Sequence, residues 1–286
     1  MTQPKFVKIV EVSPRDGLQN EKKILPVAIR VELVNRLSET GLLAVEAGAF
    51  VSPKWVPQMA GSDEVFRQIV KRPGVSYPCL VPNDQGLDAA LAAGVKEIAV
   101  FLAASETFSQ KNINCTIAES FVRNKPVIAR ALRAGIKVRG YVSCVLGCPY
   151  EGAIKPEAVY SVAHWLLTQG CYEVSLGDTI GAGTPDLTKT LLDRFIPHIP
   201  GGNLAIHCHD THNRAIDNIE AALDYGIGTV DSSVAGLGGC PFAPGAKGNV
   251  ATEKVLALLN RQKITHGVDA ARLAQVGTWI RAELSR

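Results

Sequence analysis

Short apolar segments recur along the chain at intervals of about thirty residues, and a segment with apolar residues at helical spacing follows most of them. Ile29, Leu33 and Leu37 illustrate the helical spacing, because residues four apart lie on one face of a helix. A strand followed by a helix, repeated many times, is typical of a parallel β-sheet. The eight predicted strands are 7–12, 42–45, 75–81, 97–102, 137–144, 172–176, 204–208 and 229–234.

The segments between these strands complete the pattern of a repeated strand and helix unit. A glycine stands just before five of the strands, where a helix ends and a left-handed residue is favoured. The predicted helices are 26–38, 87–93, 118–134, 156–168, 184–195 and 215–225, and the glycines are Gly41, Gly94, Gly135, Gly170 and Gly226.

Eight such units in a row predict an α/β fold, a (β/α)8 TIM barrel. An open doubly wound sheet is the weaker alternative, because no Gly-x-Gly-x-x-Gly motif follows the first strand. We expect residues 1–286 to form a single catalytic barrel domain. Within it, residues 236–286 are expected to supply an active-site loop, the closing helix and a C-terminal extension with additional helices.

Composition narrows the classes of protein that this chain can belong to. Of its 286 residues, 47% are hydrophobic and 20% are charged, as in ordinary globular proteins. The net charge of +3 and the lack of a dense Lys/Arg stripe argue against a nucleic-acid partner. No apolar run approaches the ~18 residues of a membrane span, and residues 1–6 contain no apolar signal core. We therefore expect a cytoplasmic protein with neither a nucleic-acid nor a membrane partner.

The seven cysteines are an odd number and have no paired zinc-finger spacing, so we interpret them as thiols in a reducing compartment. Cys144 and Cys148 are the one close pair. A structural role is favoured for them, because they do not form a Cys-x-x-Cys redox motif.

His207 and His209 stand at the end of the seventh predicted strand. Alternate side chains of a strand share a face, so the two imidazoles project together and Cys208 projects the other way. Two buried histidines with a purely structural role are the competing interpretation of so short a motif. Asp16 ends the first strand, and in a barrel the carboxyl ends of all strands meet at one mouth. One carboxylate and two histidines suit Mg²⁺, Mn²⁺ or non-heme iron, and the sequence leaves the choice open.

Further charged residues end other strands and are expected at the same mouth. Arg15 could stabilise negative charge that develops on a carbonyl oxygen. Glu46 ends the second predicted strand and Asp178 the sixth. Either carboxylate could pair with Arg15 and orient it, or could merely cap a helix.

A glycine-rich loop follows the last strand, with Gly236, Gly238, Gly239 and Gly245 among its residues. Such a loop permits hinging or a close approach of backbone to a ligand, and a phosphate-binding loop is the alternative. Cys240 on this loop favours a catalytic role, because a thiol above a metal site is well placed for proton transfer.

Together these residues resemble the 3-hydroxy-3-methylglutaryl-CoA lyase family, and the similarity runs through most of the chain. The segments that carry it are 13–21, 50–59, 111–115, 139–144, 175–181 and 234–241, the last being Val-Ala-Gly-Leu-Gly-Gly-Cys-Pro.

The resemblance implies a retro-Claisen cleavage of 3-hydroxy-3-methylglutaryl-CoA into acetyl-CoA and acetoacetate, with a divalent cation (Mg²⁺ or Mn²⁺) as cofactor. It implies that Arg15 stabilises the enolate and Cys240 is the catalytic thiol. Arg15 and Gln19 are expected to bind substrate, whereas no residue is assigned to the CoA nucleotide. The implied metal ligands are Asp16, His207, His209 and Asn249, and Glu46 and Asp178 are the implied supporting carboxylates of the catalytic site.

One segment departs from the family pattern. The family usually continues with Tyr-Gly-Gln where this chain has His212-Asn213-Arg214. This change beside the ligands leaves open a related lyase acting on another 3-hydroxyacyl-CoA. An enzyme condensing an acyl-CoA with a 2-oxo acid and a non-catalytic metal- or CoA-binding barrel are further alternatives. The expected partners are an acyl-CoA substrate and, from base rates, a second copy in a homodimer.

Overall fold

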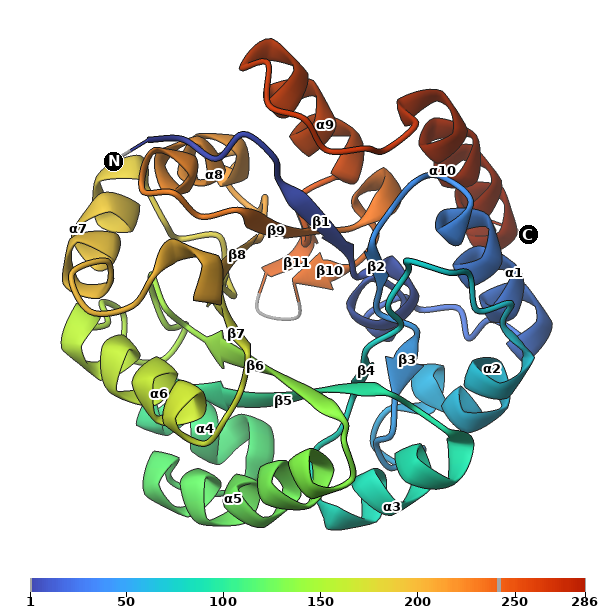
Figure 1. Ribbon diagram of the computed structural model, residues 1–286, viewed down its shortest axis with the longest axis horizontal. Helices are drawn as coiled ribbons and strands as arrows, with labels where there is room; N and C mark the ends of the chain where they lie inside the picture. Colours follow the sequence, from blue (N-terminus) through green and yellow to red (C-terminus); the bar gives the residue numbers. More distant parts are fainter. Residues whose placement is uncertain (1, 241–242, 286) are drawn as a thin grey trace.

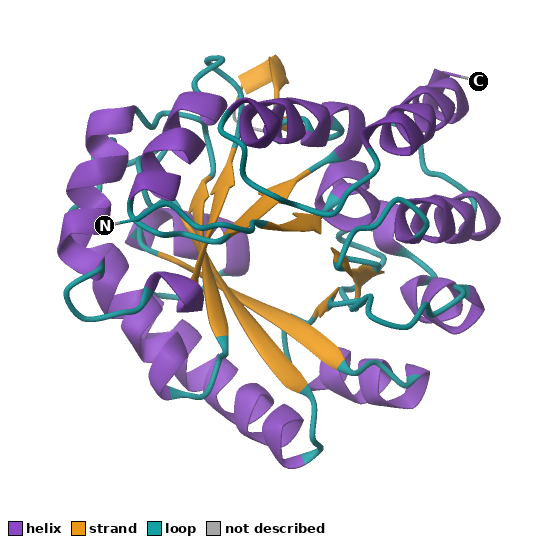
Figure 2. Ribbon diagram, turned by 45° about the horizontal axis from the view of Figure 1, so that its top comes forward, coloured by secondary structure: helices purple, strands orange, loops and turns teal. Residues whose placement is uncertain are grey.

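A parallel sheet curled into a ring forms the centre of the computed structural model, which describes residues 2–240 and 243–285. Helices surround the sheet on its outside (Figures 1 and 2). The strands of the ring are β1 (Lys8–Glu11), β2 (Ala44–Val45), β3 (Gly48–Ala49), β4 (Cys79–Leu80), β5 (Glu97–Ala103), β6 (Lys137–Ser143), β7 (Glu173–Asp178), β8 (Leu204–Cys208) and β9 (Thr229–Ser232).

The ring closes through residues 44–49, a single passage of chain that contains both β2 and β3. Strand β1 pairs with β2, and β4 pairs with β3, all in parallel. Between them the Glu46 amide donates to the Glu11 carbonyl and the Ala47 amide to the Pro78 carbonyl, each at 2.9 Å. Eight passages of chain therefore make a closed barrel, which confirms the predicted TIM-barrel fold. The predicted second strand ended too early, because backbone pairing continues past Glu46.

The predicted helices are also present, with ends displaced by three residues or fewer. All five predicted helix-ending glycines have positive φ. Two short helices, α2 and α4, were not predicted, because their mostly polar sequences give little helical periodicity. The helices are α1 (Val27–Ser38), α2 (Ser62–Gln68), α3 (Asp84–Ala93), α4 (Glu106–Ile113), α5 (Ile117–Arg133), α6 (Pro156–Thr168), α7 (Pro185–Phe195), α8 (Ala215–Asp224), α9 (Thr252–Arg261) and α10 (Ala270–Ser285).

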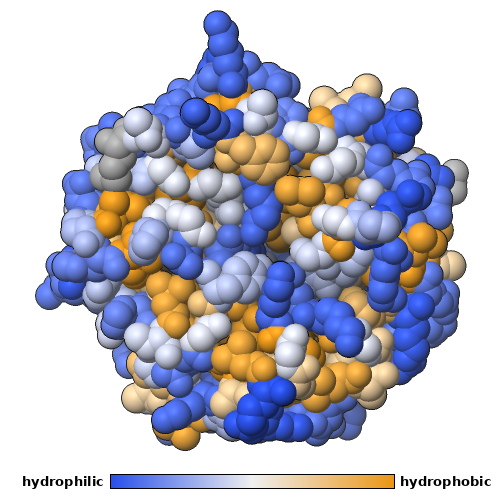
Figure 3. Space-filling model, in the orientation of Figure 1, coloured by the Kyte–Doolittle hydropathy of each residue, from blue (hydrophilic) through white to orange (hydrophobic). Residues whose placement is uncertain are grey.

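The two faces of the sheet differ in chemistry. Val138, Val174 and Ile206 lie on the outer face and belong to the main hydrophobic core beneath the helices. The alternate residues face the barrel interior, and among them Arg139 lies opposite Glu173 in the register. The space-filling view shows hydrophilic residues at the centre of the face seen in Figure 1 (Figure 3). The barrel is thus held by apolar packing outside and by buried polar pairs inside.

The segment after β9 adds a hairpin and two helices. Strand β10 (Gly239–Cys240) pairs antiparallel with β11 (Ala243–Lys247), and both lie near the barrel centre in Figure 1. Helix α10 packs beside α1, where the Arg36 guanidinium lies 4.4 Å from the centre of the Trp279 ring. In the described part of the chain, none of the helices has the length and apolar character needed to cross a membrane.

Candidate functional site

The turn after β1 places Arg15 and Asp16 at the carboxyl ends of the strands. Residues Ser13–Gly17 form one π-helical turn with Pro14 near its start. The Arg15 side chain donates through Nε to Glu46 Oε2 at 2.8 Å and through Nη1 to Asp16 Oδ1 at 2.5 Å. Burial disfavours the Arg15 charge, but the two carboxylates outweigh it and raise the pKa of Arg15 above its ordinary value. Arg15 is therefore a fixed, permanently charged group.

His207 and His209 lie beside this turn. Their ring centres are 5.3 Å apart, and His209 Nε2 is 4.0 Å from Asp16 Oδ2. Asp16, His207 and His209 each offer one ligand atom, and these atoms lie within 4.8 Å of one another. Within residues 2–240 and 243–285, they are the one group of three or more such side chains with this geometry. Nδ1 of both histidines is buried without a hydrogen-bond partner in the same residues. One carboxylate and two imidazoles in this arrangement fit a divalent cation.

The charge states of Asp16 and His209 suit the same purpose. Burial opposes ionisation of Asp16, but Arg15 and the two histidines hold the pKa of its carboxyl well below the usual range. Burial and the neighbouring His207 lower the pKa of His209 to about 4. At neutral pH Asp16 is therefore a carboxylate and His209 a neutral imidazole, the forms that bind metals.

Asn249, the fourth predicted ligand, lies against the cluster. Its Nδ2 donates to Asp16 Oδ2 at 2.9 Å and to the Leu237 carbonyl at 3.2 Å. Rotating the amide by half a turn exchanges its nitrogen and oxygen, which brings the oxygen to the Asp16 side. A Cβ on Gly238, where φ is +107°, would stand 2.9 Å from Asn249 Nδ2. The glycine is thus needed for this close approach, and metal binding by Asn249 stays a prediction.

Asp178 supports the site from the outer face of the sheet. It lies opposite Cys208 in the register, so its side chain takes the face away from His207 and His209. Its Oδ1 accepts a hydrogen bond from the Ala182 amide and its Oδ2 one from the Gly183 amide, each at 3.0 Å. Burial raises the pKa of Asp178 to about 6. Of the two carboxylates proposed for Arg15, the structure therefore pairs it with Glu46, and Asp178 orders the loop after β7.

Cys240 and Gln19 are the remaining predicted site residues. The side chain of Cys240 lies outside the described part of the molecule, and its backbone belongs to β10. Gln19 follows the Ser13–Gly17 turn, and its buried Oε1 has no hydrogen-bond partner among the described residues. The roles of both stay predictions.

The segment that departs from the family pattern, His212-Asn213-Arg214, contains one residue in a left-handed backbone conformation. Asn213 has a φ of +56°, in the left-handed region that glycine adopts freely and asparagine tolerates. Arg214 donates through Nη2 to the Ala182 carbonyl at 3.4 Å, in the loop that Asp178 orders. The backbone conformation at Asn213 is thus one that the glycine of the family pattern can also adopt.

Sequence reasoning missed three buried charged residues in the strands of the barrel: Glu11, Arg139 and Asp231. Each is 1% exposed or less. Asp231 Oδ2 lies 3.5 Å from His207 Nδ1, and Arg139 donates to both oxygens of Asp231. These residues could have been identified because each is a charged residue within an apolar strand segment. Charged residues are rarely buried unless they are paired.

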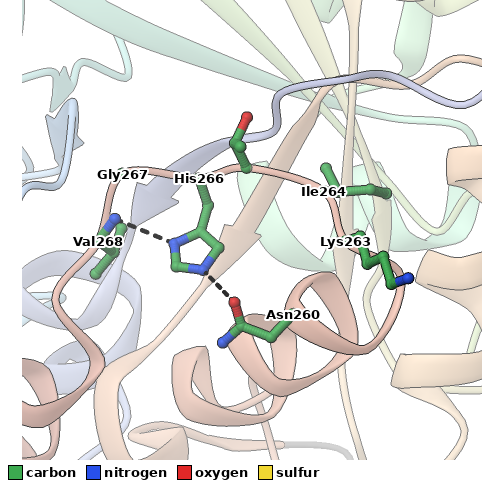
Figure 4. A pocket seen from close by; sticks show the side chains of 7 residues that line it. Asn260, Lys263, Ile264, His266, Gly267 and Val268 are labelled. Atoms are coloured by element: carbon green, nitrogen blue, oxygen red, sulfur yellow. Dashed lines mark hydrogen bonds between the residues drawn. The ribbon is translucent and has the colours of Figure 1, made fainter.

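A separate hollow lies at the other end of the barrel, beside the link between α9 and α10 (Figure 4). Thr265 in this link pairs with the chain just before β1, at the amino ends of the strands. His266 Nδ1 accepts from the Val268 amide, and its Nε2 lies 3.1 Å from Asn260 Oδ1. Both ring nitrogens are thus engaged within the protein, so this hollow presents no ligand atom from His266.

Comparison with known proteins identifies the family. The model of the HMGL-like family matches residues 6–280. The chain belongs to the HMGL-like family. It is 60% identical over 278 residues to hydroxymethylglutaryl-CoA lyase of Pseudomonas mevalonii, covering 97% of this chain and 92% of that protein. It is 57% identical to the cytoplasmic 3-hydroxy-3-methylglutaryl-CoA lyase of Rattus norvegicus, covering 97% and 81% of the two chains. The crystal structure of hydroxymethylglutaryl-CoA lyase from Pseudomonas aeruginosa superposes with a TM-score of 0.98 at 56% identity, covering 100% and 95%. The resemblance inferred from the motifs is thereby confirmed.

Proposed function

We propose that this chain is a carbon-carbon lyase that cleaves 3-hydroxy-3-methylglutaryl-CoA into acetyl-CoA and acetoacetate. The observation that carries the proposal is the cluster of Asp16, His207 and His209 beside the Arg15–Glu46 ion pair, in a chain of the HMGL-like family. The proposed cofactor is Mg²⁺ or Mn²⁺, held by Asp16, His207, His209 and Asn249. When bound, such a cation supplies Lewis-acid polarisation of substrate oxygens.

The side chains of the site divide the remaining chemistry among them. A base near Asp16 takes the proton of the tertiary hydroxyl group, and the C2–C3 bond breaks as the C3–O bond becomes a ketone. The electron pair moves into the thioester, and the Arg15 guanidinium stabilises the resulting enolate oxygen. Glu46 keeps Arg15 in place for this task. Cys240 then returns a proton to C2, which yields acetyl-CoA. Gln19 is proposed to contact the acyl group.

The wider setting of the enzyme is proposed from its composition and from base rates. We place it in the cytoplasm, as a homodimer whose small-molecule partner is an acyl-CoA. Residues 1–286 are proposed to act as one catalytic domain, with residues 236–286 supplying the active-site loop, the closing helix and the C-terminal extension.

The decisive experiment incubates the purified protein with 3-hydroxy-3-methylglutaryl-CoA, with and without Mg²⁺ or Mn²⁺. Metal-dependent release of equal amounts of acetoacetate and acetyl-CoA is the expected result. Absence of cleavage with this substrate, but cleavage of another 3-hydroxyacyl-CoA, would assign a related lyase activity. Consumption of an acyl-CoA together with a 2-oxo acid would identify a condensing enzyme, and no turnover over the whole panel would favour a non-catalytic barrel.

A further inference from the structure

A carboxylate that no step of the proposed mechanism uses lies directly beneath His207. Asp231 belongs to β9 and lies opposite His207 in the register, so both side chains face the barrel interior. Its Oδ2 is 3.5 Å from His207 Nδ1, and that nitrogen has no hydrogen bond to any described residue. The only charged side chain within ion-pairing distance of His207 in the described residues is therefore Asp231.

Hydrogen bonds from Arg139 and Ser175 hold the Asp231 carboxylate in place. Its Oδ1 accepts from Arg139 Nη2 at 2.7 Å, and its Oδ2 accepts from Arg139 Nη1 at 3.1 Å and from Ser175 Oγ at 2.7 Å. Arg139 is fixed in turn by Glu173, through Nε at 2.7 Å. A two-pronged pair between a guanidinium and a carboxylate fixes the plane of the carboxylate as well as its place. The Asp231 carboxylate is thus held in one orientation, with Oδ2 toward the His207 imidazole.

We propose that Asp231 is a positioning residue, which orients the His207 imidazole and directs its proton to Nδ1 so that Nε2 is left free to bind the cation. This inference rests on the proposed function, because it assumes a divalent cation at Asp16, His207 and His209. A carboxylate that faces one imidazole nitrogen favours the tautomer with its proton there. Such partners also increase the basicity of the coordinating nitrogen.

The charge of Asp231 supports this role. Burial opposes its ionisation, but Arg139 outweighs the burial and holds the pKa of Asp231 well below the usual range. The carboxylate is therefore charged at neutral pH. The competing interpretation is that Asp231 only balances the charge of Arg139 inside the barrel, because buried ion pairs also occur without any functional role.

The two interpretations differ in their prediction for metal affinity, which equilibrium dialysis with Mn²⁺ measures without substrate. An amide at this position can donate to Nδ1 and so favour the opposite tautomer. We expect Asp231→Asn to weaken Mn²⁺ binding by about tenfold or more. Glu173→Gln is the matched control, because it removes another carboxylate partner of Arg139 without contacting His207. It is expected to lower stability and to leave the Mn²⁺ affinity unchanged.

A double variant, Arg139→Gln with Asp231→Asn, keeps the test valid if the single variant fails to fold. It removes both charges and so leaves no unpaired charge in the barrel. Weak Mn²⁺ binding in a folded double variant supports the positioning role. Wild-type affinity in either folded Asp231 variant overturns it, as does an equal loss of affinity in Glu173→Gln. Because acetoacetate release by the wild-type protein tests the proposed function separately, the two ideas can fail independently.

Discussion

Arg15 and Glu46 form an ion pair of 2.8 Å between Nε and Oε2, which joins the turn after the first strand to the second strand passage. Glu46 is fully buried and Arg15 nearly so. An exposed guanidinium would lose most of its effect to solvent, whereas this one is held in place before substrate arrives. The pair gives Glu46 a structural role at the predicted site, because it holds Arg15 in place.

Arg15→Met is expected to lower kcat by about 10²- to 10³-fold, the usual cost of removing one group that stabilises a developing oxyanion. Glu46→Gln keeps an oxygen that can accept from Arg15 Nε, so a smaller loss of kcat is expected. Steady-state kinetics with saturating Mn²⁺ measure both variants. If Glu46→Gln were as damaging as Arg15→Met, Glu46 would have a direct part in the chemistry instead.

Removal and return of the metal should change the stability of the protein as well as its activity. After treatment with a chelator, added Mn²⁺ is expected to raise the melting temperature, since a ligand at 100 times its Kd stabilises the folded state by about 2.7 kcal/mol. His209→Ala should abolish this increase. His164→Ala is the control, because His164 is an exposed histidine on α6 that does not belong to the cluster of Asp16, His207 and His209. An unchanged increase in His209→Ala would rule out the proposed ligand set.

Cys240→Ala is expected to lose most cleavage activity while it still binds Mn²⁺, since the thiol is proposed to return a proton and not to hold the metal. Cys171→Ala provides the comparison, because Cys171 is a buried cysteine in a different part of the chain. Turnover and Mn²⁺ dialysis on the same preparations separate the two effects. Near-normal turnover of Cys240→Ala would remove the thiol from the mechanism.

The contribution of Glu11 to the stability of the protein should fall as the pH rises from about 4.5 to 7, because burial raises the pKa of Glu11 from 4.5 to about 7. At Glu11 the folded state binds more protons than the unfolded state over this range, so through this group each increase in pH favours unfolding. Glu11 Oε1 accepts from the Ser13 and Val234 amides, and Oε2 accepts from Thr252 Oγ1. Glutamine can keep the two backbone bonds and donate to Thr252.

Glu11→Gln is therefore expected to remove this contribution, which amounts to roughly 1–3 kcal/mol. Urea unfolding curves at intervals of pH measure it. If the free energy of unfolding of Glu11→Gln changed with pH over this range just as that of the wild type does, the contribution would belong to other groups.

Asn213→Gly is expected to change the free energy of unfolding by only a few tenths of a kcal/mol, because both residues accept a φ of +56°. Asn213→Val should cost about 1–2 kcal/mol, since a β-branched residue is strained in this region. Thermal unfolding measures both. Equal stability of the glycine and valine variants would show that the left-handed conformation does not constrain this position.

Much of the fold could be predicted because its signals are local. Alternation of apolar strands and amphipathic helices is set by short-range periodicity, and the glycines before the strands are read one residue at a time. The continuation of the second strand passage beyond Glu46 could not be predicted in this way. Pairing beyond it depends on the Glu11 and Pro78 carbonyls, which come from other parts of the chain.

The sequence by itself determined the barrel, the mouth at which its polar strand ends gather, and the identity of Asp16, His207 and His209 as a possible metal site. The rule that strand ends meet at one mouth makes these conclusions independent of exact distances. Only the tertiary structure decided that Arg15 pairs with Glu46, that Asp178 faces outward, and that Asp231 lies beneath His207. Each of these facts depends on which face of which neighbouring strand a side chain occupies, and that is set by the register between segments far apart in the chain.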